Sequence, residues 1–122
     1  SNVKKITKSI EIVYGLRNFI GNANKFSKST IYINLKSDSE ITQISIEDDG
    51  SGYSRDVLSK IGEPYLKSNN PIVKSKTGLG LGLFIGKTLL EKNFASINCR
   101  NSKTKSGAEI IIRWNNRDLF NI

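Results

Sequence analysis

Histidine is absent from the 122-residue sequence, and cysteine occurs once, as Cys99. Without histidine the chain has no histidine-based nucleophilic or general-base catalysis of its own. With one cysteine as well, a zinc site is not expected. The lone cysteine excludes an internal disulfide framework and is typical of a reducing compartment, so we expect Cys99 to be a core residue. Any chemistry must use carboxylates, amides, lysines, bound Mg²⁺ or a residue from another chain.

Long apolar runs and a secretory signal are also lacking. No run approaches the ~18 apolar residues of a membrane span. Hydrophobic residues make up 37% and charged residues 25%, which is typical of a globular domain, and the length predicts a single domain over 1–122. The 19 Lys and Arg residues outnumber the 11 Asp and Glu, for a net charge of +8. This balance favours a nucleotide, a nucleic acid, an acidic protein or an anionic membrane surface as partner, without choosing among them.

The stretch EDDGSG carries the first functional signal. Ile44 and Ile46 alternate with polar residues, which predicts a half-buried strand, and the same alternation places Asp48 on the apolar face. A carboxylate there is costly unless it has a partner. Gly50 and Gly52 let the backbone turn and let another group approach closely. Two interpretations follow: Asp48 contacts a ligand, or it caps its own backbone in a turn.

A helical pattern covers residues 10–25. The residues predicted to face the core are Ile12, Val13, Leu16, Ile20 and Ala23. Asn18, Asn22 and Lys25 follow one another at helical spacing and form a separate polar stripe. Two amides and a lysine can coordinate a cation and hold phosphate; the alternative is a plain solvent-exposed face.

A second glycine-rich segment follows a long polar stretch. Residues 66–77 are rich in Lys, Ser and Asn, and a loop of this length in a small domain is usually functional or mobile. Gly78, Gly80 and Gly82 then open an apolar helix that runs to about Glu91. Its predicted inner face consists of Leu81, Phe84, Ile85, Thr88 and Leu89. Glycines at a helix start expose backbone N–H groups that attract anions; alternatively they allow tight packing on a sheet.

The remaining segments complete the predicted fold. The predicted elements are an edge strand or arm in 1–8, a helix at 10–25, strands at 31–36 and 41–48, helices at 55–61 and 78–91, and strands at 95–100 and 109–114. The strands come mostly in hairpin-like pairs. This order predicts an α/β (α+β) two-layer sandwich, with a mixed, mostly antiparallel sheet of about five strands and three helices on one face.

The polar segments are chemically complementary. The helix stripe offers Mg²⁺ and phosphate ligands, Asp48 a fixed acceptor at the floor of a cleft, and Gly78–Gly82 a phosphate-binding backbone. A carboxylate accepts a hydrogen bond from the amine of adenine and repels the carbonyl of guanine. At ~1.5–3 kcal/mol for such a bond, one aspartate selects adenine by about tenfold to over a hundredfold. Residues 62–77 would close over the nucleotide as a mobile lid.

These segments, in this order, resemble the catalytic ATP-binding domain of sensor histidine kinases. That domain has the Bergerat fold and belongs to the wider ATPase group that includes HSP90, gyrase B and MutL. The matching motifs are an N box at 18–26 (NFIGNANKF), a first Gly box at 48–52 (DDGSG), an F-box-like motif at 61–65 (IGEPY), a second Gly box at 78–83 (GLGLGL) and a last one at Gly107. The resemblance covers residues 9–114. The segments 62–65 and 80–91 look closest to the RegB/PrrB subgroup.

The resemblance implies residue roles. Asn22 would ligate Mg²⁺, Asn18 and Lys25 would be the catalytic groups near the phosphates, Phe26 would border the nucleotide, and Asp48 would read the adenine amine. Further ATP contacts are implied for Gly50, Gly52, Lys67, Lys76, Thr77, Gly78, Leu79, Gly80, Leu81 and Gly82.

The resemblance also implies partners. In this family the phosphorylated histidine lies on a separate dimerisation domain, so we expect that domain and the sensor domain to be absent from this chain. A response regulator would be an indirect partner. Neither nucleic acid nor membrane contact is expected of this fragment. The location would be cytoplasmic, with the parent protein anchored in the inner membrane.

One position departs from the hydrolytic relatives, where a glutamate general base stands four residues before the Mg²⁺ asparagine. Here that position is Asn18, and an amide cannot take a proton from water, which favours phosphotransfer over ATP hydrolysis. Two other functions stay open. The chain could be a non-catalytic ATP-sensing domain of a degenerate kinase. It could also be a basic nucleic-acid-binding module, although its aromatic residues are few and not interleaved with the basic ones.

Overall fold

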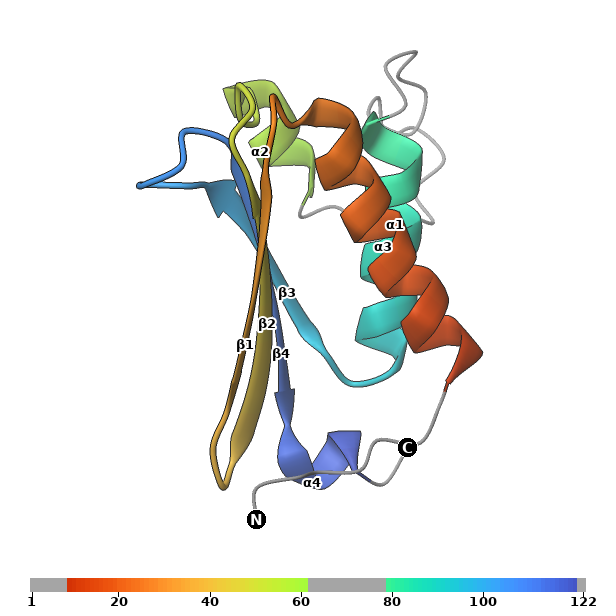
Figure 1. Ribbon diagram of the computed structural model, residues 1–122. Helices are drawn as coiled ribbons and strands as arrows, with labels where there is room; N and C mark the ends of the chain where they lie inside the picture. Colours follow the sequence, from red (N-terminus) through yellow and green to blue (C-terminus); the bar gives the residue numbers. More distant parts are fainter. Residues whose placement is uncertain (1–8, 62–78, 121–122) are drawn as a thin grey trace.

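One antiparallel sheet and two long helices form the body of the molecule. The computed structural model describes residues 9–61 and 79–120 (Figure 1). Its elements are α1 (Ile10–Phe26), β1 (Ile31–Ser37), β2 (Ile41–Asp48), α2 (Arg55–Ile61), α3 (Leu79–Lys92), β3 (Ser96–Asn101), β4 (Ala108–Asn115) and α4 (Asn116–Leu119). The strand order is β1-β2-β4-β3, and every neighbouring pair is antiparallel.

The predicted two-layer architecture is confirmed, with differences in detail. Helices α1 and α3 lie side by side on one face of the sheet, α2 lies near one end, and α4 lies at the other (Figure 1). The sheet has four described strands rather than five, because the expected first strand falls in 1–8, outside the described residues. Beyond the last predicted strand, residues Asn116–Leu119 form the short helix α4. None of the described helices is both long and apolar enough to cross a membrane.

Helix α1 is rotated from the side that its periodicity predicted, although Ile12 and Ala23 are buried as expected and Leu16 packs against the core. It begins after Ser9, whose hydroxyl oxygen accepts a hydrogen bond from the backbone N–H of Ile12 at 3.3 Å. The buried residues are Ile12, Gly15, Phe19 and Ala23. Val13 and Ile20, predicted to face the core, are 42% and 38% exposed. The prediction was therefore wrong for these two side chains.

Close packing between α1 and α3 explains this rotation. A Cβ atom on Gly86 would lie 2.7 Å from Cε1 of Phe19 and 3.0 Å from the carbonyl oxygen of Gly15. A Cβ atom on Gly15 would lie 2.9 Å from Cγ of Leu90. The glycines allow the two backbones to approach closely, so the side of α1 that carries Gly15 faces inward.

Helix α3 shows a similar shift. Leu83, Phe84 and Leu90 are buried, whereas Ile85, Thr88 and Leu89, predicted to face inward, are only half-buried. The surroundings of Leu81 lie outside the description. Because α3 packs against both α1 and β3, its buried surface is wider than a single stripe.

The inner face of the sheet completes the core and carries the polar group of interest. Ile46 of β2 and Ile112 of β4 are 2% and 0% exposed, and Asp48 shares their face at 4%. Trp114 donates its indole N–H to the carbonyl oxygen of Asn93 at 3.0 Å. Cys99 packs against the same core, which confirms its predicted place, and burial raises the pKa of its thiol to about 12. Cys99 is therefore a protonated core thiol at neutral pH.

Candidate nucleotide site

Asp48, the last residue of β2, uses only one of its two carboxylate oxygens within the protein. Oδ1 accepts hydrogen bonds from the backbone N–H of Gly50 at 2.8 Å and of Ala108 at 3.3 Å. Oδ2 makes no hydrogen bond with the described part of the chain. Asp48 thus caps its own turn with one oxygen and leaves the other for a ligand, so the two interpretations of the sequence do not exclude each other.

Glycines make this arrangement sterically possible. Gly52 has a φ of +80°, in the left-handed region that favours glycine. A Cβ atom on Gly50 would overlap the carbonyl oxygen of Phe26, and one on Gly107 would overlap the carbonyl and carboxylate oxygens of Asp48. The first Gly box and Gly107 are therefore required by the close approach of the backbone to Asp48 and to the end of α1.

A cavity of about 220 Å³ opens beside Asp48. It is bounded by the end of α1, the turn after β2, the start of α2 and the start of β4. The lining residues are Asn22, Phe26, Asp48, Ser51, Gly52, Tyr53, Ser54, Val57 and Ala108. The cavity has apolar walls and one carboxylate, which is the composition expected of a site for a flat, mostly apolar ring with a polar edge.

A second cavity, of about 230 Å³, lies between α1 and the start of α3. It is lined by Arg17, Asn18, Gly21, Asn22, Lys25 and Gly82. Asn22 lines both cavities, so it stands where they meet. The structure thus brings together the three segments that the sequence predicted to be complementary: the polar stripe of α1, Asp48 and the second Gly box.

Two side chains of the stripe have defined contacts. Asn18 donates its amide N–H to the carbonyl oxygen of Tyr14 at 2.8 Å, and its Oδ1 lies 3.4 Å from where a Cβ atom of Gly82 would be. Lys25 places its ammonium 5.5 Å from the ring centroid of Phe26, a cation–π distance. Asn18 therefore faces the start of α3, and Lys25 lines the second cavity beside Phe26, which lines the first.

Some predicted contacts fall outside the described residues. These are Lys67, Lys76, Thr77, Gly78, the F-box-like motif beyond Ile61 and the lid at 62–77. Leu79, Gly80 and Leu81 form the first turn of α3, as the helix prediction required.

The sequence reasoning missed seven lining residues: Arg17, Gly21, Ser51, Tyr53, Ser54, Val57 and Ala108. Arg17 and Gly21 precede Lys25 at helical spacing, so the same periodicity could have found them. Ser51 lies within the first Gly box, Tyr53 and Ser54 follow it directly, and Val57 lies in the first turn of α2. Ala108 carried no local signal, because only the antiparallel pairing of β2 with β4 brings it beside Asp48.

A family model, "Histidine kinase-, DNA gyrase B-, and HSP90-like ATPase", matches residues 7–118, nearly the whole chain. The chain belongs to this ATPase family. Its motifs and the geometry around Asp48 agree with that membership.

Sensor histidine kinases are the relatives that it matches in sequence. RegB of Cereibacter sphaeroides is 36% identical over 102 residues, which are 80% of this chain and 22% of RegB. The sensor protein KdpD of Clostridium acetobutylicum is 36% identical over 93 residues, 75% of this chain and 10% of KdpD. The resemblance seen in the motifs is confirmed, and the chain spans about a fifth of the length of RegB and less of KdpD.

Solved histidine kinase structures share the fold. Full-length ShkA in complex with AMPPNP superposes with a TM-score of 0.68 at 23% identity, covering 93% of this chain and 23% of ShkA. The mycobacterial sensor histidine kinase MprB gives 0.69 at 21% identity, covering 90% of this chain and 76% of MprB. At these identities the likeness establishes the fold of the ATPase domain.

In this ATPase domain, Asp49 ties the end of α1 to the turn that carries the first Gly box. Its carboxylate accepts hydrogen bonds from the backbone N–H groups of Lys28 (2.8 Å), Ser29 (3.1 Å) and Thr30 (3.3 Å), and from the hydroxyl of Ser29 (2.8 Å). The hydrogen bonds from Ser29 hold the pKa of Asp49 well below its usual range. Asp49 thus fastens residues 28–30, which follow α1, to the turn after β2, and it lines neither cavity.

This lowered pKa predicts a specific loss of stability in acid. The unfolded chain takes up a proton on Asp49 near pH ~4, while the folded protein does so only at lower pH. The contribution of Asp49 is therefore complete above the unfolded pKa and lost as the pH falls below it. We expect the unfolding free energy, measured by denaturant titration, to fall more steeply from pH 6 to pH 3 in the wild type than in Asp49→Asn. Parallel pH curves would contradict this role.

Tyr53 has a well-anchored backbone and an unpaired hydroxyl. Its N–H donates to Oδ1 of Asn101 at 2.6 Å, and its carbonyl accepts from the Asn101 amide at 3.0 Å. The hydroxyl oxygen is buried and has no hydrogen-bond partner in the described part of the chain. Burial is the main reason that the pKa of Tyr53 is raised far above its usual value, and Cys99 and Asp48 add to it.

Removing this hydroxyl is expected to stabilise the ligand-free protein. An unsatisfied buried polar group costs about 1–3 kcal/mol, so Tyr53→Phe should raise the unfolding free energy by about 1 kcal/mol and the melting temperature by a few degrees. Tyr14→Phe is the matched control, because Tyr14 is 50% exposed and its hydroxyl stays hydrated. Differential scanning calorimetry of both variants tests this. A destabilised Tyr53→Phe variant would show that the hydroxyl has a partner.

Proposed function

We propose that this chain is the ATP-binding catalytic domain of a two-component sensor histidine kinase. It binds Mg-ATP and presents the γ-phosphate to a histidine supplied by a separate dimerisation domain, and the phosphoryl group then passes to a response regulator. The parent protein would be anchored in the inner membrane with this domain on the cytoplasmic side. The observation that carries the proposal is the carboxylate of Asp48 in the lining of a 220 Å³ cavity, with one oxygen that has no partner among the described residues.

Adenine fits the first cavity. The amine of adenine donates to a carboxylate oxygen, and Oδ2 of Asp48 is the acceptor that has no partner in the described part of the chain. Phe26 and Val57 supply apolar walls for the ring. The carbonyl of guanine would face the same carboxylate and be repelled, so the site selects ATP over GTP.

The triphosphate would extend into the second cavity. Arg17 and Lys25 bring two positive charges to its wall, and the start of α3 lies at Gly82. Asn22 stands between the two cavities, where its side-chain oxygen can serve as one ligand of Mg²⁺. Mg²⁺ usually takes one or two ligands from protein and the rest from phosphate and water. The ion would neutralise phosphate charge, and Lys67, Lys76 and the backbone at Gly78–Gly82 would add donors.

Catalysis by this domain would consist of positioning and charge neutralisation. In the transfer, the bond between the γ-phosphorus and the bridging oxygen of ADP breaks, and a bond from the histidine nitrogen to that phosphorus forms. Asn18 faces the start of α3 and cannot act as a base toward water. Its place in the site therefore favours transfer to histidine over loss of the phosphate to water.

A transfer assay tests the proposal. The purified domain is mixed with γ-labelled ATP, Mg²⁺ and a histidine-bearing dimerisation domain of a sensor kinase, and acid-labile label on that domain is measured. We expect labelling that requires both this chain and Mg²⁺, with no comparable labelling from GTP. ATP binding without labelling would favour a regulatory ATP sensor. Absent ATP binding, together with salt-dependent DNA binding insensitive to Asp48→Asn, would favour a nucleic-acid module.

A further inference from the structure

The face of the sheet opposite the helices is open in the described part of the molecule (Figure 1). Two shallow hollows lie along it, one of about 360 Å³ near the β1–β2 turn and one of about 310 Å³ further along the strands. Both are lined by Lys36 and Gln43, so they form one continuous groove over the sheet. Neither hollow shares a lining residue with the nucleotide cavities.

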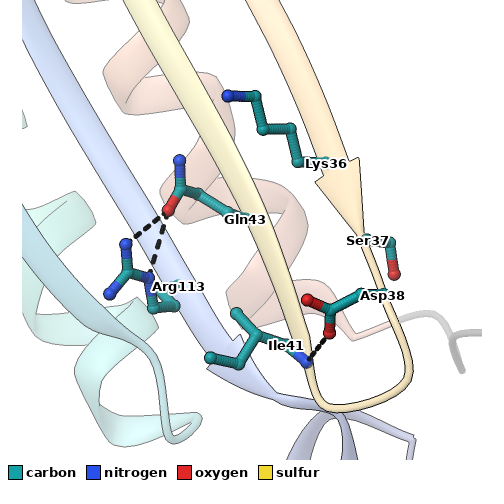
Figure 2. A pocket seen from close by; sticks show the side chains of 6 residues that line it. All are labelled: Lys36, Ser37, Asp38, Ile41, Gln43 and Arg113. Atoms are coloured by element: carbon teal, nitrogen blue, oxygen red, sulfur yellow. Dashed lines mark hydrogen bonds between the residues drawn. The ribbon is translucent and has the colours of Figure 1, made fainter.

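A row of three polar side chains crosses this groove. Lys36 of β1 pairs with Gln43 of β2, and Gln43 pairs with Arg113 of β4. Directly paired residues point to the same face, and Figure 2 shows the three side chains on neighbouring strands. At about 4.8 Å per strand, the backbones of the two cationic residues lie roughly 10 Å apart. The row therefore presents two positive charges with an amide between them.

The hydrogen bonds leave this row with donors facing outward. Arg113 donates from Nε and Nη2 to Oε1 of Gln43, at 3.1 and 2.7 Å (Figure 2). The side-chain oxygen of Gln43, its only acceptor, is thus occupied by the guanidinium, and its amide N–H groups make no hydrogen bond with the described residues. The ammonium of Lys36 makes no hydrogen bond or ion pair with the described residues. The side-chain groups that remain for an external ligand are donors, two of them charged.

The nearest carboxylates have partners of their own. Asp38 accepts from the backbone N–H groups of Glu40 and Ile41, both at 2.8 Å. Glu47 accepts from the hydroxyl of Ser102 at 2.6 Å, and Glu109 from the guanidinium of Arg100 at 2.6 Å. Glu109 is neutralised by Arg100, whereas the donors to Asp38 and Glu47 named here are neutral, so these two carboxylates keep their charge. None of the three bonds to Lys36 or Arg113, so the cationic groups of the row keep their donors for an anion from outside.

We propose that the row Lys36–Gln43–Arg113 binds an acidic, extended segment of a partner protein. Two cationic residues on strands about 10 Å apart suit a ligand that carries more than one negative group. In an extended peptide, carboxylates two positions apart lie on the same side, roughly 7 Å from each other. The guanidinium of Arg113 is directed toward Gln43, so the charges of the row lie closer together than the backbones and suit this spacing. Ile41 and Ile111 line the groove and offer apolar contact to the aliphatic parts of the peptide's side chains. The charge of +8 favours the same class of partner.

A charge-matched pair of variants tests this docking site. Gln43→Glu places a carboxylate between Lys36 and Arg113, where it would pair with these cationic groups and compete with an anion from outside. Lys103→Ala, in the exposed β3–β4 turn, changes the net charge by the same single unit. The probe is a fluorescein-labelled peptide of five Glu-Thr repeats, with a Lys-Thr peptide as control, and binding is followed by anisotropy at 150 mM salt.

We expect saturable binding of the acidic peptide by the wild type. Gln43→Glu should weaken it about tenfold or more, as expected for losing a charge-assisted hydrogen bond, and Lys103→Ala by less than about twofold. Absence of saturable binding, or equal loss in both variants, overturns the proposal. So does competition by inorganic phosphate at the same concentrations, or tighter binding of duplex DNA with the same sensitivity to Gln43→Glu. ATP affinity, measured in parallel, reports on the nucleotide site alone and should be unchanged in both variants.

Discussion

Asp48→Asn is expected to lower the affinity for ATP by about a hundredfold, the equivalent of ~2.7 kcal/mol. The asparagine oxygen can still cap the turn by accepting from Gly50 and Ala108, as Oδ1 of Asp48 does. Its amide nitrogen replaces Oδ2, however, and would point a donor at the amine of adenine, which is also a donor. The substitution therefore removes a charged acceptor and adds a donor–donor conflict while the fold is retained. Calorimetric titration with ATP and Mg²⁺ measures the change.

The neighbouring aspartate gives a matched control for this experiment. Asp49→Asn alters the charge equally, but Asp49 lines neither cavity, and its hydrogen bonds within the described ranges all go to residues 28–30. We expect its ATP affinity to stay within about twofold of wild type at pH 7. GTP should bind weakly to the wild type and lose less affinity than ATP on Asp48→Asn. Equal ATP affinity in the wild type and Asp48→Asn would show that Asp48 does not accept a hydrogen bond from adenine.

Local sequence patterns were sufficient to locate half of the residues that line the two cavities. The alternation in β2 placed Asp48 on the buried face because side chains of a strand point to opposite faces in turn. Helical spacing placed Asn18, Asn22 and Lys25 on one side of α1, and the structure has all three on one cavity. Each of these signals lies within a few residues of the side chain it concerns, so no knowledge of the tertiary fold was needed.

The features that were missed depend on contacts between distant segments. Val13 and Ile20 were assigned to the core because they are apolar and periodic, but Gly15 and Gly86 allow α1 and α3 to approach on another side. Glycine contributes nothing to a hydrophobic pattern, so the true contact side was not evident from the sequence. Ala108 reaches Asp48 only through strand pairing across 60 positions. The sequence therefore predicted which segments are helices and strands, but it did not predict how the helices are oriented or which strands are neighbours.

Asn18→Glu is expected to increase the rate at which the domain hydrolyses ATP. A positioned general base typically contributes about 10²–10⁴-fold, so we expect the steady-state rate of ATP hydrolysis by the purified domain to rise by about a hundredfold. The wild-type side chain lines the proposed phosphate cavity together with Asn22 and Lys25. Its oxygen lies near Gly82, which has no side chain to obstruct a residue one methylene longer. A carboxylate there could take a proton from a water molecule that attacks the γ-phosphate.

Asn18→Gln separates the effect of the base from the effect of size. Glutamine has the length of glutamate but no proton-accepting carboxylate, so its hydrolysis rate should remain at the wild-type level. Phosphate release is measured at saturating Mg-ATP, with Asn18→Glu,Asp48→Asn as a second control that should lose the gain through weaker ATP binding. Equal rates for the Glu and Gln variants would mean that position 18 does not reach the attacking water. A rise confined to Asn18→Glu would show that the wild-type amide keeps the γ-phosphate intact until a histidine arrives.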